Sequence, residues 1–219
     1  MKKVSLTIDG REITANEGEK LLWVALDNDI YIPNLCALSD RRKPLSSCRL
    51  CFVEVVGEEE PVLACNLSVA DGMRINTRGE KARQLARTAF DLLMASNVVD
   101  CGHCAANRAC ELQVIAHHLR AKLQGKRFTK QLRHFPIDDS SPLFIYNPDR
   151  YVLCERCVWV CRERLGIGAI GFAHRGFERM VTTFCHESIG ADCRDCRQCV
   201  AVCPTGALAF KKKEPTPAC

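Results

Sequence analysis

The cysteines are the residues of this chain whose type and spacing most clearly predict chemistry. The 219-residue sequence contains 16 cysteines, and all except Cys185 and Cys219 fall into four groups. Each group contains two cysteines separated by two residues, a spacing that lets both thiolates bind one metal centre. We therefore expect several metal centres with sulfur ligands. The groups are Cys36, Cys48, Cys51 and Cys65; Cys101, Cys104 and Cys110; Cys154, Cys157 and Cys161; and Cys193, Cys196, Cys199 and Cys203.

Disulfides are the other use of so many cysteines, and the rest of the sequence argues against them. The N-terminus, MKKVSLTIDG, alternates apolar and polar residues, so no secretory signal is expected. No stretch approaches the roughly 18 apolar residues of a membrane span. A chain in the reducing cytoplasm keeps its thiols free, which favours metal ligands over disulfides. A cytoplasmic location is therefore expected.

The charge pattern gives little support to nucleic-acid binding. The net charge is +5, and the basic residues concentrate in RAKLQGKRFTKQLR, residues 120–133. The single aromatic residue of this stretch is too few for stacking on bases. The favoured interpretation is a solvated helix face and loop, and docking to an acidic partner surface is the alternative.

The third and fourth cysteine groups lie in two stretches that look like copies of one motif, named here the first and the second phrase. Residues 150–161 read RYVLCERCVWVC, and residues 192–208 read DCRDCRQCVAVCPTGAL. They resemble a two-cluster bacterial ferredoxin, in which each phrase gives three cysteines to one 4Fe-4S cluster and its fourth to the other. The resemblance implies two ligand sets. One is Cys161, Cys193, Cys196 and Cys199, and the other begins with Cys154, Cys157 and Cys203.

The second of these sets has no cysteine at its fourth position, where Tyr151 stands instead. A phenolate is an acceptable ligand for haem iron, but a substituted aromatic residue more often packs. Cys185, between the phrases, is the other candidate, with a buried spare thiol as its alternative role. Cys219 lies in the tail KKKEPTPAC, which is expected to be disordered, and is not expected to be a ligand.

The first group is carried by a long loop, IPNLCALSDRRKPLSSCRLCFVEV. Four thiolates would also suit a zinc ion. Loop-held cysteines on a small helix-and-sheet module are instead typical of 2Fe-2S ferredoxins. The spacing is closely similar to the first iron-sulfur module of the complex I large subunit and of the small diaphorase subunit of NAD-linked hydrogenases. The resemblance implies a 2Fe-2S cluster at Cys36, Cys48, Cys51 and Cys65.

The second group resembles the next cluster of the same family, a 4Fe-4S centre held by three cysteines and one histidine. The three cysteines are Cys101, Cys104 and Cys110, but Asn97 and Val99 stand where the family has its histidine. Asn97 or Asp100 is the candidate for the fourth ligand, and His117 or His118 could fold back from the following helix. His103 is expected to be an ordinary loop residue. A three-iron cluster and a water ligand remain open.

The elements that would position these groups follow from turns and periodicity. Two alternating segments joined at Asp9-Gly10 predict a hairpin. Residues 17–30 place Leu21, Leu22, Ala25 and Leu26 on one helical face, and CFVEVVG and residues 61–77 alternate as strands. Thr77 and Glu80 form a capping-box pattern before a helix that carries Leu85, Ala89, Leu92 and Leu93 at helical spacing. A further helix is expected over residues 111–123.

We therefore predict an α+β protein. Its predicted parts are a 2Fe-2S β-grasp ferredoxin domain at residues 1–78, a helical cysteine-rich 4Fe-4S module at residues 79–133, a linker at residues 134–148, a two-4Fe-4S ferredoxin-like domain at residues 149–211, and a flexible tail at residues 212–219.

The order of these modules resembles the iron-sulfur portion of the complex I large subunit, hydrogenase diaphorase subunits and NAD-dependent formate dehydrogenases. Larger relatives continue into a catalytic metal domain, and this chain is expected to be a separate, non-catalytic subunit. The resemblance implies one 2Fe-2S cluster and two to three 4Fe-4S clusters. These would carry electrons between a flavin/NAD(P)-binding diaphorase subunit and a catalytic metal subunit of hydrogenase or formate dehydrogenase type. The alternatives are a free-standing multi-cluster ferredoxin and a zinc-bound structural or regulatory module.

Overall fold

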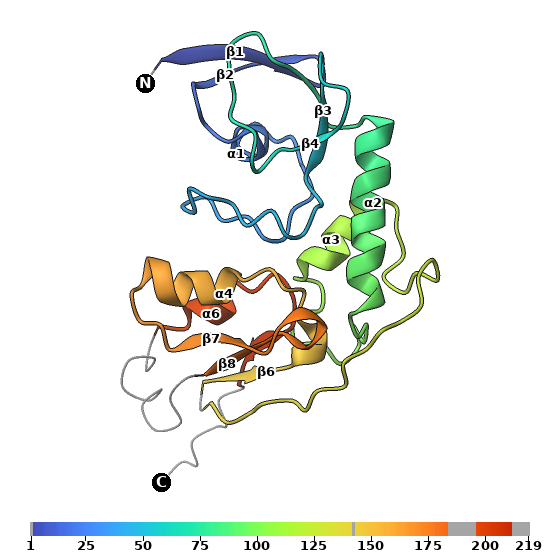
Figure 1. Cartoon of the computed structure of the whole chain (residues 1–219), viewed down its shortest axis with the longest axis vertical. Helices are drawn as coiled ribbons and strands as arrows, with labels where there is room; N and C mark the ends of the chain where they lie inside the picture. The colour runs from blue at the N-terminus through green and yellow to red at the C-terminus, as the bar shows by residue number, and fades with distance from the viewer. Residues whose placement is uncertain (1, 142, 184–195, 212–219) are drawn as a thin grey trace. The chain divides into compact units, whose positions relative to one another are not determined.

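The computed structural model describes residues 2–141, 143–183 and 196–211 (Figure 1). The chain divides into two compact units, one of Met1–Ala95 and Gln113–Thr129, the other of Ser96–Leu112 and Lys130–Cys219. In the described part, no helix has both the length and the apolar character needed to cross a membrane. The domain boundaries expected from the sequence stay a prediction.

The first unit is built on a five-stranded mixed sheet. Its strands are β1 (Lys3–Ile8), β2 (Arg11–Asn16), β3 (Phe52–Val55), β4 (Val62–Leu63) and β5 (Arg74–Asn76). Their order is β2-β1-β5-β3-β4; β1 and β5 are parallel, and the other pairs are antiparallel. The β1–β2 turn has φ values of 49° at Asp9 and 84° at Gly10, as a two-residue hairpin turn requires. The predicted hairpin is confirmed.

Helix α1 (Leu21–Leu26) lies against this sheet (Figure 1) and supplies much of the core. Leu21, Leu22 and Ala25 are fully buried, as the periodicity predicts. Val24 is also buried, whereas Leu26 packs only partly. The buried alternate residues of β1 (Val4, Leu6 and Ile8) complete this core, which also contains Cys51 and Cys65.

Helix α2 (Glu80–Ala95) begins at the predicted position but uses another face and another N-terminal contact. Its buried residues are Ala82, Ala86, Phe90 and Met94, while Leu85 and Leu92 are exposed, so the predicted face was wrong. The predicted capping box was also wrong. The Thr77 hydroxyl donates to Asp9, and the N–H of Ala82 donates to the Glu54 carboxylate.

Helix α3 (Glu111–His118) is shorter than the predicted 111–123, because the chain turns at Arg120, whose φ is 50°. Like a glycine at a helix C-terminus, a residue with positive φ ends the regular helical bonds.

The second unit contains two small antiparallel sheets and several short helices. The sheets pair β6 (Phe144–Tyr146) with β9 (Leu208–Phe210), and β7 (Ile170–Ala173) with β8 (Met180–Thr183). The helices are η1 (Pro148–Arg150), α4 (Arg156–Trp159), η2 (Val160–Arg164), η3 (Gly176–Glu178) and α6 (Gln198–Ala201). β6 lies inside the stretch expected to be a linker, because Phe144 and Tyr146 alternate with Ile145 and bury against the core. That part of the stretch is therefore a strand.

Candidate metal centres

The first cysteine group lies together within the first unit. All four thiols are buried, and the Sγ atoms of Cys36 and Cys48 are 3.4 Å apart. Cys65 lies 3.5 Å from the Ser46 hydroxyl, and the N–H of Ala64 donates to the carbonyl of Cys51. The loop from Leu35 to Cys51 and the turn after β4 thus bring the four predicted ligands together. Their donor set is entirely sulfur, which suits iron-sulfur clusters or zinc.

The four thiols form two hydrogen-bonded pairs, and in each pair the hydrogen bond lowers the pKa of one thiol and raises that of the other. Sharing a proton with Cys48 lowers the pKa of Cys36 and raises that of Cys48. In the same way, the hydrogen bond with Cys51 lowers the pKa of Cys65 and raises that of Cys51. Each pair therefore holds one thiolate readily, which is the form that binds metal.

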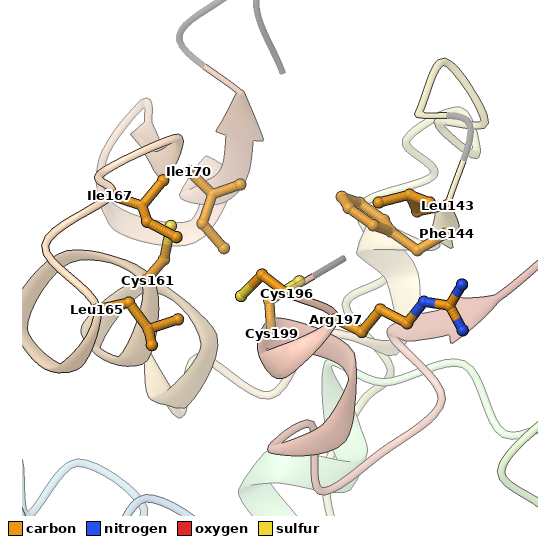
Figure 2. Close-up of a pocket in the computed structure, with 9 residues that line it drawn as sticks. All are labelled: Leu143, Phe144, Cys161, Leu165, Ile167, Ile170, Cys196, Arg197 and Cys199. Atoms are coloured by element: carbon orange, nitrogen blue, oxygen red, sulfur yellow. The ribbon is translucent and has the colours of Figure 1, made fainter. Parts of the chain in front are cut away.

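The cysteines of the two C-terminal phrases line two separate pockets. The first, named here the Cys161 pocket, combines Cys161 from η2 with Cys196 and Cys199 from the second phrase (Figure 2). Its other walls are the apolar side chains of Leu143, Phe144, Leu165, Ile167 and Ile170, while the guanidinium group of Arg197 points away from the sulfur atoms. Cys193, the fourth predicted ligand, lies outside the described residues, as do Cys185 and Cys219.

The second pocket, named here the Cys157 pocket, combines Cys154 and Cys157 of the first phrase with Cys203 of the second. Each pocket thus draws cysteines from both phrases. Burial raises the pKa of Cys157, and the nearby Cys154 and Cys203 add to the rise. In the described part of the chain, no three Cys, His, Asp or Glu side chains converge closely enough for a single ion. The three cysteines of each pocket line its walls.

Tyr151 forms the wall of the Cys157 pocket at the predicted fourth position. Its side chain is 4% exposed, and its hydroxyl has no hydrogen-bond partner among the residues that the structure describes. Burial and the nearby Cys157 and Cys154 raise the pKa of this phenol. Tyr146 lines the same pocket, but its hydroxyl accepts a hydrogen bond from the N–H of Val181 at 3.1 Å. Burial raises the pKa of Tyr146 to about 12.

Three of the Cys-x-x-Cys turns share one backbone feature. The residue after the first cysteine is left-handed in each, with φ values of 54° at Arg49, 59° at Glu155 and 49° at Arg197. Successive left- and right-handed residues turn neighbouring N–H groups toward one side, which makes a concave site for an anion. Such a site suits the negative charge of a thiolate-bound cluster.

The second cysteine group lies on a loop of the second unit. Cys101, Cys104 and Cys110 are half-buried. A Cβ atom on Gly206, in the second phrase, would collide with Sγ of Cys104. The N–H of Glu111 donates to the carbonyl of Pro204 at 2.9 Å. The loop carrying these cysteines therefore docks on the C-terminal phrase.

An ion pair between a buried arginine and a partly exposed glutamate adds to this docking. Both guanidinium nitrogens Nη1 and Nη2 of Arg156 bond the Glu111 carboxylate, at 2.6 and 3.1 Å. The side chain of Arg156 is 9% exposed. Sequence reasoning missed both this pair and Gly206, since only the folded chain brings these positions together.

The candidates for the fourth ligand of this group differ in their surroundings. Asn97 is 3% exposed, and its Nδ2 has no hydrogen-bond partner in the described part of the chain. Asp100 lies at the surface, where its carboxylate is 3.0 Å from Nδ1 of His103. His117 and His118 are exposed on α3, and the His118 ring packs edge-on against Tyr31 at 4.8 Å. Burial therefore favours Asn97 over Asp100 as the fourth ligand.

The fold decides whether one glycine-rich loop could bind a dinucleotide. Gly166, Gly168 and Gly171 have the G-x-G-x-x-G spacing of dinucleotide-binding loops. That loop binds pyrophosphate when it follows a strand and opens a helix. Here it follows η2 and leads into β7 (Ile170–Ala173), which is the reverse context. The glycines therefore make no dinucleotide site of that kind.

Comparison with known proteins finds similarity to one iron-sulfur family and to subunits of several oxidoreductases. Residues 1–80 match the family described as "2Fe-2S iron-sulfur cluster binding domain". The NADPH-Fe(3+) oxidoreductase subunit alpha of Geobacter sulfurreducens is 36% identical over 208 residues, which are 95% of this chain and 24% of that protein. The chain thus spans about a quarter of that relative.

Two further relatives have nearly the length of this chain. The NAD-reducing hydrogenase HoxS subunit gamma of Cupriavidus necator is 28% identical over 95% of this chain and 88% of that protein. A chain of a crystal structure of NAD+-reducing [NiFe]-hydrogenase in the H2-reduced state superimposes with a TM-score of 0.83. It is 26% identical and covers 98% of this chain and 90% of its own.

Proposed function

This chain is homologous to iron-sulfur subunits of NAD(P)-linked oxidoreductases, and from that premise we propose that it is an electron-transfer subunit of such a complex. Its electrons would pass singly between a flavin/NAD(P)-binding diaphorase subunit and a catalytic metal subunit of hydrogenase or formate dehydrogenase type. The chain itself would catalyse no substrate reaction, and its location would be the cytoplasm. The subunit names and lengths of the relatives support this role.

The observation that carries the proposal is the sharing of cysteines between the two phrases. Cys203 lies with Cys154 and Cys157, whereas Cys161 lies with Cys196 and Cys199. In two-cluster ferredoxins, each phrase lends one cysteine to the cluster of the other. A zinc knuckle has no need of this exchange, because one or two short turns already complete its tetrahedron.

The proposed cofactors are one 2Fe-2S cluster and two to three 4Fe-4S clusters. Iron-sulfur clusters supply one-electron redox centres when bound. The protein would hold them in apolar walls and direct N–H groups at their sulfur atoms, which tunes their potentials. The proposed ligands are Cys36, Cys48, Cys51 and Cys65; Cys101, Cys104 and Cys110 with Asn97 or Asp100; Cys154, Cys157 and Cys203 beside Tyr151 or Cys185; and Cys161, Cys193, Cys196 and Cys199.

The arrangement of the two C-terminal pockets suits transfer between neighbouring clusters. Cys157 on α4 and Cys161 on η2 belong to one continuous helical segment and are four residues apart. At about 1.5 Å per residue, this places the two wall cysteines about 6 Å apart along the helix axis. An electron would therefore cross only a short stretch of protein between the two sites.

Anaerobic purification with metal and sulfide analysis tests the proposal. We expect roughly 10 to 14 irons per chain, acid-labile sulfide, and an EPR signal of a two-iron cluster after reduction. Co-purification with a flavoprotein in gel filtration separates a subunit from a free-standing ferredoxin. Fewer than about four irons, with zinc in their place, would show that the chain is a zinc-bound module.

A further inference from the structure

Tyr151 forms a wall of the Cys157 pocket, and its hydroxyl lacks a partner there. The side chain is 4% exposed, and the described residues provide no hydrogen bond to its hydroxyl. The same pocket is lined by Cys154, Cys157 and Cys203. Burying a hydroxyl without a partner is unfavourable, so the folded protein has a reason to place an acceptor inside this pocket.

The tyrosine is held in this position by its backbone and its ring. Its N–H donates to the carbonyl of Pro148 at 3.0 Å, and its carbonyl accepts a hydrogen bond from Nη2 of Arg133 at 2.8 Å. Its ring packs edge-on against the ring of Tyr146, with 6.3 Å between their centroids. The backbone at Tyr151 is therefore fixed, and swinging the side chain out of the pocket would break the ring contact with Tyr146.

The size of the phenol decides what the pocket can hold. A cysteine at position 151 would place its sulfur one bond beyond Cβ, whereas the tyrosine extends a six-membered ring into the same region. The ring therefore takes up more of the pocket than a cysteine side chain would. Val152, Val181, Ala207 and Leu208 form apolar walls. The hydroxyl of Thr205, which also lines the pocket, donates to the carbonyl of Arg150 and accepts from the N–H of Ala207. A water ligand would therefore find few free hydrogen-bond partners there.

We propose that the Cys157 pocket holds a three-iron, four-sulfide cluster through Cys154, Cys157 and Cys203, and that Tyr151 closes the empty corner by donating its hydroxyl proton to a cluster sulfur. This inference rests on the proposed function, because it takes the pocket to be an iron-sulfur site. Sulfides at the empty corner have lost one metal bond and are good hydrogen-bond acceptors. The hydrogen bond stabilises the more negative, reduced cluster and so raises its midpoint potential.

The test compares three variants of the full chain, purified anaerobically together with whatever partner subunits accompany it. Oxidised three-iron clusters are paramagnetic, whereas oxidised two-iron and four-iron clusters of the ferredoxin type are EPR-silent. We expect the wild type and Tyr151→Phe to show the oxidised-state signal, with a lower midpoint potential in Tyr151→Phe. Tyr151→Cys is expected to lose about one oxidised-state spin and to gain about one iron per chain.

The matched control is Tyr146→Phe. It removes a hydroxyl from the same pocket, but one that is already bonded to the N–H of Val181. Iron content and midpoint potential are expected to stay at the wild-type values. A shift as large as that of Tyr151→Phe would contradict the assignment of the hydrogen bond to Tyr151.

Three results would overturn the inference. Loss of iron in Tyr151→Phe would make the phenolate an iron ligand. Absence of the oxidised-state signal in the wild type would exclude the three-iron cluster. A wild-type four-iron cluster that becomes a three-iron cluster in Cys185→Ala would assign the corner to Cys185. The two-iron signal of the reduced samples is independent of these results, and only its absence together with bound zinc would refute the proposed function itself.

Discussion

Replacing Gly206 by alanine tests whether the Cys101 loop is held in place by the C-terminal phrase. A Cβ atom on this residue would collide with Sγ of Cys104, so one of the two segments must move. The backbone at Gly206 does not have positive φ, and the added methyl group is therefore the only source of strain. Overpacking of this kind costs about 1–3 kcal/mol, which is about a 5- to 150-fold change in an equilibrium constant.

The collision falls on a proposed ligand, so its main effect is expected at the cluster. The contact is relieved by rotating the Cys104 thiol, by shifting its loop or by shifting the segment of Gly206, and the first two movements displace a proposed ligand. We expect Gly206→Ala to lose about three to four irons per chain and the EPR signal of this cluster, while the two-iron signal remains.

Gly102→Ala is the matched control, because it adds the same methyl group in the same loop. Its Cβ would meet only Oδ1 of Asp100, at 3.9 Å, which is an ordinary contact. Iron content should therefore stay at the wild-type value. If Gly206→Ala kept its full iron content and its resistance to urea, the docking of this loop on Gly206 would be wrong.

Three other substitutions test separate parts of the structure. Asn97→His should stabilise the Cys101 cluster against loss of iron in air, because Asn97 is 3% exposed. Asp100→Asn should have no effect, since that carboxylate faces His103 at the surface. Equal behaviour of the two variants would exclude Asn97 as the neighbour of the cluster. Glu111→Gln should lower the free energy of unfolding by about 1–3 kcal/mol, because it weakens the pairing of the Arg156 guanidinium group, which is 9% exposed. The measurement is an earlier loss of cluster absorbance in urea. Glu163→Gln, in an exposed pair, is its control and should change stability by less than about 0.5 kcal/mol. Cys51→Ser should remove the reduced two-iron EPR signal and leave the other clusters, and an unchanged signal would show that Cys51 is not a ligand.

Local features of the sequence predicted the first unit well, because its turns and strands are fixed by near neighbours. The Asp9-Gly10 pair requires positive φ at both residues, and the alternation of β1 then determines which side chains enter the core. The resemblance of the two phrases to a two-cluster ferredoxin also predicted which described cysteines line each C-terminal pocket. In each case the information lies within a short stretch or in a repeat.

Features that depend on distant contacts were predicted poorly. Helical periodicity allows two overlapping apolar faces on α2, and the fold buries the one with Phe90 and Met94 instead of the one with Leu85 and Leu92. The Thr77 hydroxyl donates a hydrogen bond to Asp9, 68 residues away, so it does not cap the start of α2 as predicted. The docking of Gly206 on Cys104 likewise joins segments about a hundred residues apart.

The two sites that lack a fourth cysteine share one physical property. Asn97 and Tyr151 stand at the two positions where the family has a ligand, and each has a buried polar atom without a hydrogen-bond partner among the described residues. Both side chains are neutral. At Tyr151 the replaced group is a thiolate, whereas at Asn97 it is a histidine, which is itself neutral. In the three-iron cluster proposed for the Cys157 site, the absent iron and the absent thiolate remove charges of opposite sign, so its net charge equals that of a four-iron cluster with four thiolates in the Cys161 site. Substituting Tyr151 by cysteine would restore both groups and leave this net charge unchanged.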